Sequence, residues 1–310
     1  MSGIGSGHVL SALPNETLRL LFGRSSCRDF SAGKIPEDVL SLVLEAGTHA
    51  PTAGNLQPYS ILRIENEETK CKLAEVCEQS CIGEAPVLLL FCLDLHRNER
   101  WANLETAPYT AASSFRHFWV SFQDTIICAQ SICTAAESMG LGSVYIGTVI
   151  DKPEEIQAIF KLPKGVFPVV LVCMGYPTKR VKPRKKLGAK VVVHSERYME
   201  MKDQEIMDAY NEKYVEELQR AKKLGVSEES LRTITKVCRA VNGEEFAEKC
   251  ADRIRANGYI NIAQHYFGLH YRADLMPKGN ENYVRIMEKS GFKWFKKYQP
   301  PVLTRRAQKE

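Results

Sequence analysis

The sequence lacks long hydrophobic runs, closely spaced cysteine pairs and internal repeats, and each absence excludes a class of protein. No run reaches the ~20 apolar residues that a membrane-spanning helix needs, so we expect no membrane partner. None of the 10 cysteines belongs to a C-x-x-C pair. This argues against a zinc or iron–sulfur centre, and we predict no metal site. Residues 1–7 are rich in glycine and serine and have no apolar core, so we expect no secretory signal.

A strong charge imbalance is also missing. The 310 residues carry a net charge of +5, and 44% of them are hydrophobic and 25% charged, as in an ordinary globular protein. Basic residues are spread along the chain except at 179–190 and near the C-terminal end. Nothing here demands nucleic acid, and we predict no nucleic-acid partner.

Several cysteines lie where buried free thiols are found. Cys92, Cys128, Cys133 and Cys173 stand inside apolar runs. Disulfides form mainly in oxidising compartments. The cysteine pattern therefore favours a reducing, cytoplasmic setting.

Helical and strand patterns alternate up to about residue 200. Two continuous apolar runs, 85–93 and 167–174, predict strands buried on both faces. Shorter strands are predicted at 60–64 and 143–146, and helices at 14–22, 36–47, 67–77, 118–139 and 152–160. The helix at 118–139 is apolar nearly all round and must be buried, either in a monomer core or in a dimer core.

The composition changes after the second buried strand. Residues 178–200 are basic and irregular, and helical patterns follow at 203–224, 227–240, 244–256 and 259–270. We therefore predict an α+β domain over 1–200 and a helical C-terminal extension over 201–310. Residues 96–117 look irregular and are interpreted as an insertion in the first domain.

Two basic clusters suit a phosphate. Arg24 and Arg28 place guanidinium groups four residues apart, with the hydroxyls of Ser25 and Ser26 between them. The planar donor fork of arginine matches phosphate oxygens. A second basic run, 182–186, follows the second buried strand and a Gly-Tyr-Pro turn. The two clusters could meet around one phosphate, or they could be unrelated solvated patches.

Two further segments could receive a flat ring. In the loop 49–59, Pro51 and Pro58 lack an amide donor, and the loop presents a Thr hydroxyl and two side-chain amides. An ordinary helix-to-strand connection is the alternative interpretation. The segment 140–148 begins Gly-Leu-Gly, and glycine lets a ligand approach the backbone closely. It follows a helix and opens none, so a dinucleotide-binding G-x-G-x-x-G turn does not fit.

In their order along the chain, these motifs resemble the nitroreductase family of FMN-dependent oxidoreductases. Arg-Ser-Ser-x-Arg-x-Phe comes first, then Ala-Pro-Thr-x-x-Asn-x-Gln-Pro-Tyr, then Ala-Pro before an apolar strand. Gly-Leu-Gly-Ser-x-x-Ile-Gly follows, and Gly-Tyr-Pro with Lys-Pro-Arg comes last. The match covers roughly residues 15–200. It implies the family fold, an α+β mixed sheet flanked by helices, in an intertwined homodimer with FMN sites at the interface.

The resemblance implies roles for the basic residues. Arg24, Ser26 and Arg28, with Ser25 among them, match positions that hold the phosphate, ribityl chain and pyrimidine edge of FMN. Lys182 and Arg184 match a second phosphate clamp, in which Lys185 or Lys186 is an alternative to Arg184.

The resemblance also implies roles for the polar loop and the glycine turn. The loop that reaches FMN from the partner subunit is matched by Pro51, Thr52, Ala53, Asn55 and Gln57. Gln79 matches an amide that reads the pyrimidine ring. Ile146, Gly147 and Thr148 match a turn that faces flavin N5, where the Gly147 backbone amide is the candidate catalytic group.

The implied activity is transfer of hydride from NAD(P)H to a small aromatic, quinone or nitro acceptor in a ping-pong cycle, with FMN carrying the chemistry. Trp101, Tyr109 and His117 are candidate acceptor contacts in a lid formed by the insertion; packing of these rings onto their own domain is the alternative. Two other functions stay open. One is a different FMN branch, such as flavin fragmentation or reductive dehalogenation, and the other is a non-catalytic flavin-binding redox module.

Overall fold

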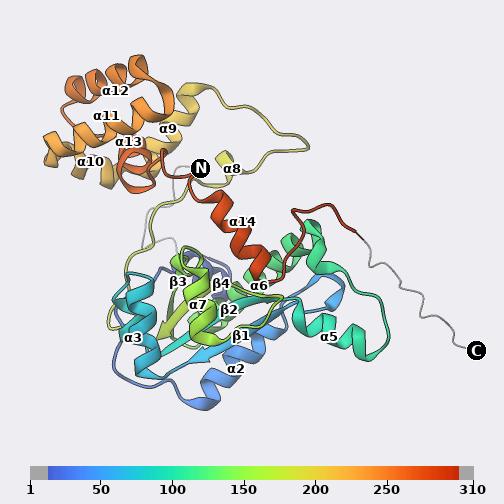
Figure 1. Ribbon diagram of the computed structural model, residues 1–310. Helices are drawn as coiled ribbons and strands as arrows, with labels where there is room; N and C mark the ends of the chain where they lie inside the picture. The colour runs from blue at the N-terminus through green and yellow to red at the C-terminus, as the bar shows by residue number, and fades with distance from the viewer. Residues whose placement is uncertain (1–12, 300–310) are drawn as a thin grey trace, which may run out of the picture. The chain divides into compact units, whose positions relative to one another are not determined.

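The computed structural model describes residues 13–299, and these form two compact units. The first unit joins residues up to Pro183 with those from Asn282 onward, and the second covers Arg184–Glu281. The first is a sheet flanked by helices and the second is helical (Figure 1). This division differs from the predicted boundary at residue 200, because the segment after 281 packs into the first unit.

The first unit is built on a four-stranded sheet in the order β1-β2-β4-β3. The strands are β1 (Tyr59–Ile64), β2 (Val87–Asp94), β3 (Gly142–Ile146) and β4 (Val166–Gly175). Every residue of β2 and β4 is buried, as the two apolar runs predict.

The α+β class is confirmed, but the strand pairings are antiparallel where the resemblance implied a mixed sheet. Within residues 13–299, a parallel pairing occurs only at the isolated bridge between Ser26 and Ser143. Apolar runs that are buried on both faces carry no information on strand direction, so the sequence pattern could not settle this point.

Alternate side chains of β2 enter two different cores. Leu89 and Phe91 pack with α2 (Glu37–Thr48) and α6 (Phe115–Ser138). Leu88 and Leu90 pack with α3 (Glu67–Val76) and α7 (Pro153–Phe160). The remaining short elements of the first unit are α1 (Glu16–Gly23), α4 (Cys81–Glu84) and the 3₁₀ turns Ala53–Asn55, Ala111–Ser113 and Thr148–Ile150.

The long helix α6 is buried on one face only. Cys128, Ile132 and Ala136 are fully buried, and a Cβ on Gly47 of α2 would lie 2.1 Å from Ile132, so the two helices touch closely. The opposite face exposes large apolar side chains: Phe115 51%, Trp119 51%, Phe122 36% and Ile127 41%. The predicted all-round burial is therefore incomplete in one chain, and an exposed apolar stripe of this kind marks an interaction surface.

The predicted insertion 96–117 is more ordered than its sequence suggests. It contains the helix α5 (His96–Leu104), whose start is fixed by a hydrogen bond from the Arg97 N–H to Asp94 Oδ1 (2.9 Å). The helix is mostly polar, so the segment lacks the apolar periodicity by which a helix is recognised.

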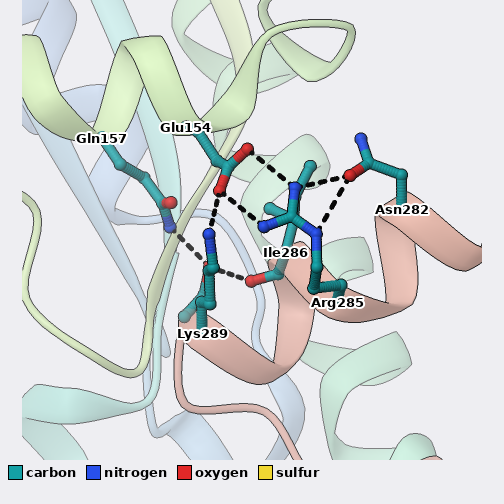
Figure 2. Close-up of polar contacts among 7 residues, drawn as sticks. Glu154, Gln157, Asn282, Arg285, Ile286 and Lys289 are labelled. Atoms are coloured by element: carbon teal, nitrogen blue, oxygen red, sulfur yellow. Dashed lines mark hydrogen bonds and ion pairs between the residues drawn. The ribbon is translucent and has the colours of Figure 1, made fainter.

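After the second unit, the chain returns to the first at α14 (Asn280–Lys289). Ile286 and Met287 are each 4% exposed and Phe292 is 0% exposed, in the same core as Phe91. On the polar side of α14, Glu154 of α7 pairs with Lys289 (2.9 Å) and Arg285 (3.3 Å) (Figure 2). This segment belongs to the first unit because its apolar face completes that unit's core.

The second unit holds the predicted helices. They are α8 (Ala189–Val192), α9 (Asp203–Lys213), α10 (Val215–Leu224), α11 (Glu228–Asn242), α12 (Glu244–Asn257), α13 (Ile262–His265) and a π-helical turn, Tyr266–His270. Leu231 and Ile234 of α11 pack against Ala251 and Ile254 of α12. This small core is formed within the unit itself.

All ten cysteines are free thiols. Over residues 13–299, no helix has both the length and the apolar character of a membrane span. The same residues contain no cluster of three or more His, Cys, Asp or Glu side chains that could hold a metal ion.

Phe292→Ala should lower the free energy of unfolding of the first unit by ~3–5 kcal/mol, because it empties a filled core position. All three tryptophans (Trp101, Trp119, Trp294) lie in that unit, so urea unfolding followed by tryptophan fluorescence reports on it. Phe22→Ala removes an equal ring that is 50% exposed in the same unit and should change the value by less than about 0.5 kcal/mol. Equal effects of the two substitutions would show that the C-terminal segment is no part of this core.

Candidate functional site

The segment that contains Arg24 and Arg28 lies between two other motifs. On one side, the Cys27 N–H donates to the Ser143 carbonyl (3.0 Å). On the other side, the Ser31 N–H donates to Tyr176 O (2.8 Å), and the Thr178 N–H donates to Asp29 O (3.1 Å). Three motifs that are far apart in the sequence are therefore adjacent in the fold.

Two glycines permit this close approach. A Cβ on Gly142 would lie 2.7 Å from Cys27 Cβ, and a Cβ on Gly175 would lie 2.6 Å from Pro86 Cδ. Both distances are too short for any other residue. The contact at Gly175 brings the Ala-Pro motif before β2 to the same place.

The second basic segment joins this arrangement through its backbone and through Arg180. The Ser25 hydroxyl donates to the Val181 carbonyl (2.6 Å). Arg180 Nη2 donates to the carbonyls of Gly140 (3.1 Å) and Leu141 (3.2 Å). Lys182 belongs to the first unit, whose first stretch ends at Pro183, whereas Arg184 opens the second. The predicted phosphate clamp of Lys182 and Arg184 therefore stays a prediction.

An open groove of about 900 Å³ lies between α1 and the C-terminal half of α6. Among the residues that line it are Arg24, Gln130, Thr134, Glu137 and Arg180. Arg24 Nε and Nη2 are buried there and have no hydrogen-bond partner among the described residues. Burying a cation without a partner is costly. An anionic ligand group could pair with the buried Arg24 donors, while the carboxylates of Glu16 and Glu137 line the same groove and Glu137 Oε1 also has no partner among the described residues.

The glycine turn and Gln79 form a second part of the arrangement. Ile146 is 2% exposed, and the Thr148 hydroxyl donates to the Cys77 carbonyl (3.2 Å), two residues from Gln79. Gly147 is exposed, and a Cβ built on it would meet no atom within 4 Å. The backbone at Gly147 is thus open to a ligand.

Arg28 lies near the chain around Gln79. The hydrogen bond with Cys173 lowers the pKa of the Cys81 thiol, and the positive charge of Arg28 lowers it further. Arg28 itself is exposed. The cation is therefore available on the same side of the sheet as the chain around Gln79.

The loop 51–57 is held away from these residues. The Ala53 N–H donates to the Asp124 carboxylate (3.2 Å), and the Gln57 side-chain amide donates to Thr48 O (3.0 Å). Gln57 thus stabilises the loop from inside, whereas Pro51, Ala53 and Asn55 are exposed. Asn55 has φ of 54°, a left-handed conformation that asparagine tolerates better than most residues.

The helix α6 separates the loop from the groove. Asp124 contacts the loop, and Glu137 lines the groove 13 residues later. At 1.5 Å of rise per residue, these positions are about 20 Å apart along the helix. The groove's lining on α6 begins at Gln130, six residues after Asp124, so the loop contact lies about 9 to 20 Å along the helix from the residues that line the groove.

The candidate acceptor residues lie on different elements. Trp101 is 58% exposed on α5, and His117 is exposed, with Nδ1 2.8 Å from Ser114 Oγ. Tyr109 packs against the core of its own unit, where burial raises its pKa to about 12. Their role as acceptor contacts therefore stays a prediction.

Sequence reasoning missed Trp294 and Arg180. The Trp294 ring lies 5.0 Å from Phe115 and 5.5 Å from Phe118, and its indole N–H is buried without a partner among the described residues. Trp294 belongs to the segment that follows the second unit, and no local pattern indicates that return. Arg180 stands two residues before Lys182, so the edge of the basic run was its only signal.

Comparisons with known proteins agree on one family. The family model for nitroreductases matches residues 21–176. An FMN reductase (NAD(P)H) of Bacillus subtilis is 31% identical over 187 residues, which are 60% of this chain and 75% of that protein. An oxygen-insensitive NADPH nitroreductase of Salmonella typhimurium is 29% identical over 201 residues, 64% of this chain and 81% of that protein.

A solved structure is also similar to this chain. NADPH:FMN oxidoreductase from Vibrio harveyi, complexed with NAD+, superposes with a TM-score of 0.59 at 30% identity and covers 69% of this chain and 93% of its own. The family model covers half of the chain, and it includes the segment of Arg24 and Arg28, the Ala-Pro motif and the Gly-Leu-Gly motif, which lie together in the fold. The chain belongs to the nitroreductase family.

Proposed function

We propose that this chain is an FMN-dependent oxidoreductase that takes hydride from NAD(P)H. The observation that carries the proposal is the Arg24 guanidinium, which is buried in the groove with two donor atoms unpaired. The phosphate of FMN would supply the charge-assisted hydrogen bonds that this group lacks. The names of the relatives, an FMN reductase and an NADPH nitroreductase, support the same activity.

The motifs that meet around Arg24 give each part of FMN a contact. Arg24 and Lys182 would hold the phosphate, Ser25 and Ser26 the ribityl chain, and Arg28 with Gln79 the pyrimidine edge. Since Ser25 already donates to Val181, its hydroxyl would act mainly by fixing the second basic segment.

FMN, when bound, supplies the hydride chemistry. The chain's own residues would orient the flavin and stabilise the negative charge that develops on it. The exposed Gly147 N–H, between Ile146 and Thr148, would donate to negative charge that develops beside it. The Arg28 cation would favour negative charge at the pyrimidine edge.

We infer that two copies of the chain share each site. The loop 51–57 and the groove at Arg24 lie at different positions along α6, and the same helix exposes an apolar stripe at Phe115, Trp119 and Phe122. Burial of this stripe against a second copy would make a homodimer and would let one chain lend its loop to the other. Pro51, Thr52, Ala53 and Asn55 would then contact FMN, while Gln57 holds the loop.

The acceptor is proposed to be a small aromatic, quinone or nitro compound. The Salmonella relative is named as a nitroreductase, which supports a nitro acceptor here. If donor and acceptor use the same flavin face in turn, the cycle is ping-pong. Trp101 and His117, both exposed, stay candidates for acceptor contacts. Separately, the ten free thiols support a reducing, cytoplasmic setting.

The purified chain should bind FMN and turn yellow, and Arg24→Ala should raise the FMN dissociation constant by about ten- to a hundredfold, because a charge-assisted contact is lost. Fluorescence quenching of FMN on titration with protein gives the constant. Arg19→Ala is the matched control, because it removes an equal charge from α1 that is paired with Glu16. A chain that takes up no FMN would disprove the proposed function.

Mixed dimers of Arg24→Ala and Asn55→Ala chains should recover FMN binding. If the loop comes from the partner, one of the two sites in a mixed dimer receives both defects and the other receives none, which gives about one FMN per dimer. The mixed dimers are isolated with two different affinity tags, and flavin is measured by absorbance. If loop and groove belonged to one chain, every site would be defective and nothing would be recovered.

Gly147→Pro should lower turnover by about a hundredfold, the effect of removing one backbone donor from a developing charge. The φ of Gly147 is −81°, which proline can adopt, so the substitution removes the N–H with little strain. Gly147→Ala keeps the N–H and points its methyl group into open space, so it should behave like the wild type. Stopped-flow reduction of bound FMN by NADPH separates the two. Equal rates in both variants would exclude a role for this amide.

A further inference from the structure

Arg180 fixes a chain segment that has no regular structure of its own. Residues 178–188 lie outside any helix or strand. Arg180 Nη2 donates to Gly140 O (3.1 Å) and Leu141 O (3.2 Å), just beyond the end of α6. Backbone carbonyls are left unsatisfied at a helix C-terminus, and a guanidinium is a favourable partner there.

The other half of the Arg180 guanidinium pairs with Glu137, in the last turn of α6. The Glu137 side chain is only 4% exposed. The Arg180 side chain is 47% exposed, so loss of Arg180 would leave the buried Glu137 carboxylate without its cation. Arg180 is therefore anchored from two directions, by a carboxylate and by two carbonyls.

The contacts of Arg180 position the two residues that follow it, Val181 and Lys182. Val181 follows directly, and its carbonyl accepts the Ser25 hydroxyl (2.6 Å). Lys182 comes next, one residue before Pro183, where this stretch of the first unit ends. The contacts of Arg180 thus hold the second basic segment against the segment of Arg24 and Arg28.

Arg24 and Arg180 line the same groove but differ in their contacts. Arg24 Nε and Nη2 are buried without a partner among the described residues. Both terminal nitrogens of Arg180 are engaged by Glu137 and the two carbonyls. Two donor atoms of the first guanidinium have no partner among the described residues, whereas both terminal nitrogens of the second are held by the protein.

We propose that Arg180 is a positioning residue that sets the phosphate end of the flavin site by holding Val181 and Lys182 beside Ser25. The inference rests on the proposed function, because it concerns how FMN is held. It assigns Arg180 no contact with FMN. The Arg180–Glu137 pair would instead arrange in advance the groups that receive the phosphate.

The test compares FMN with riboflavin, which has the same ring and ribityl chain but no phosphate. Arg180→Ala should raise the dissociation constant for FMN by about tenfold and leave that for riboflavin within about twofold, since only the phosphate contacts are displaced. Lys179→Ala is the matched control. It removes the same charge from the neighbouring residue, which is 72% exposed and pairs with Asp29 (3.3 Å). Both constants should stay at the wild-type value in this control.

Each outcome decides the question. Equal weakening of FMN and riboflavin would mean a general structural role and would overturn the inference, as would an unchanged FMN constant. If circular dichroism shows Arg180→Ala to be unfolded, Arg180→Lys is measured instead. It keeps the charge but cannot reach the carboxylate and both carbonyls together, and a smaller rise for FMN alone supports the inference. A wild-type chain that binds neither flavin would overturn the proposed function itself. If the wild type binds FMN and Arg180→Ala leaves its dissociation constant unchanged, only the positioning role of Arg180 is overturned.

Discussion

The arrangement of the site depends on the close backbone approach at Gly142 and Gly175. Any side chain at either position would collide with Cys27 or Pro86. Because these side chains are absent, the segment from Arg24 to Phe30 lies hydrogen-bonded between Ser143 and the turn after β4. The antiparallel pairing of β3 with β4 then places the start of one strand beside the end of the other, at Gly142 and Gly175. The basic side chains, the glycine turn and the Ala-Pro motif meet because these two backbones touch.

The elements of the fold were predictable where burial and periodicity agree. The strands β2 and β4, with flanking helices such as α2 and α7, were expected close to their observed bounds. Strand direction was not predictable, because runs buried on both faces look alike in either direction. The return of α14 was missed for another reason. Ile286, Met287 and Phe292 fill a core made by residues more than a hundred positions away, and a short amphipathic helix does not reveal which core it joins.

The candidate site was predictable to the level of its segments. The sequence motifs named Arg24, the glycine turn and the second basic run, and the structure brings those segments into contact. Individual roles were harder to predict. The motif predicted the same role, contact with FMN, for Gln57 and Asn55. In the structure the Gln57 amide donates to Thr48 O, whereas Asn55 is exposed. Arg180 belonged to no motif, because its importance comes from Glu137 and two carbonyls that lie about 40 residues earlier.

The helix α6 connects these observations. Near its middle, Asp124 holds the polar loop, and at its end Glu137 holds Arg180 and lines the groove. These two points lie 13 residues, or about 20 Å, apart along the helix. An apolar stripe runs along the same helix and is exposed. A second copy packed on that stripe in the opposite direction would bring its loop to the first chain's groove. The exposed apolar surface, the loop contact and the groove contact therefore lie on one helix, so in the proposed dimer association and completion of the flavin site would be a single event.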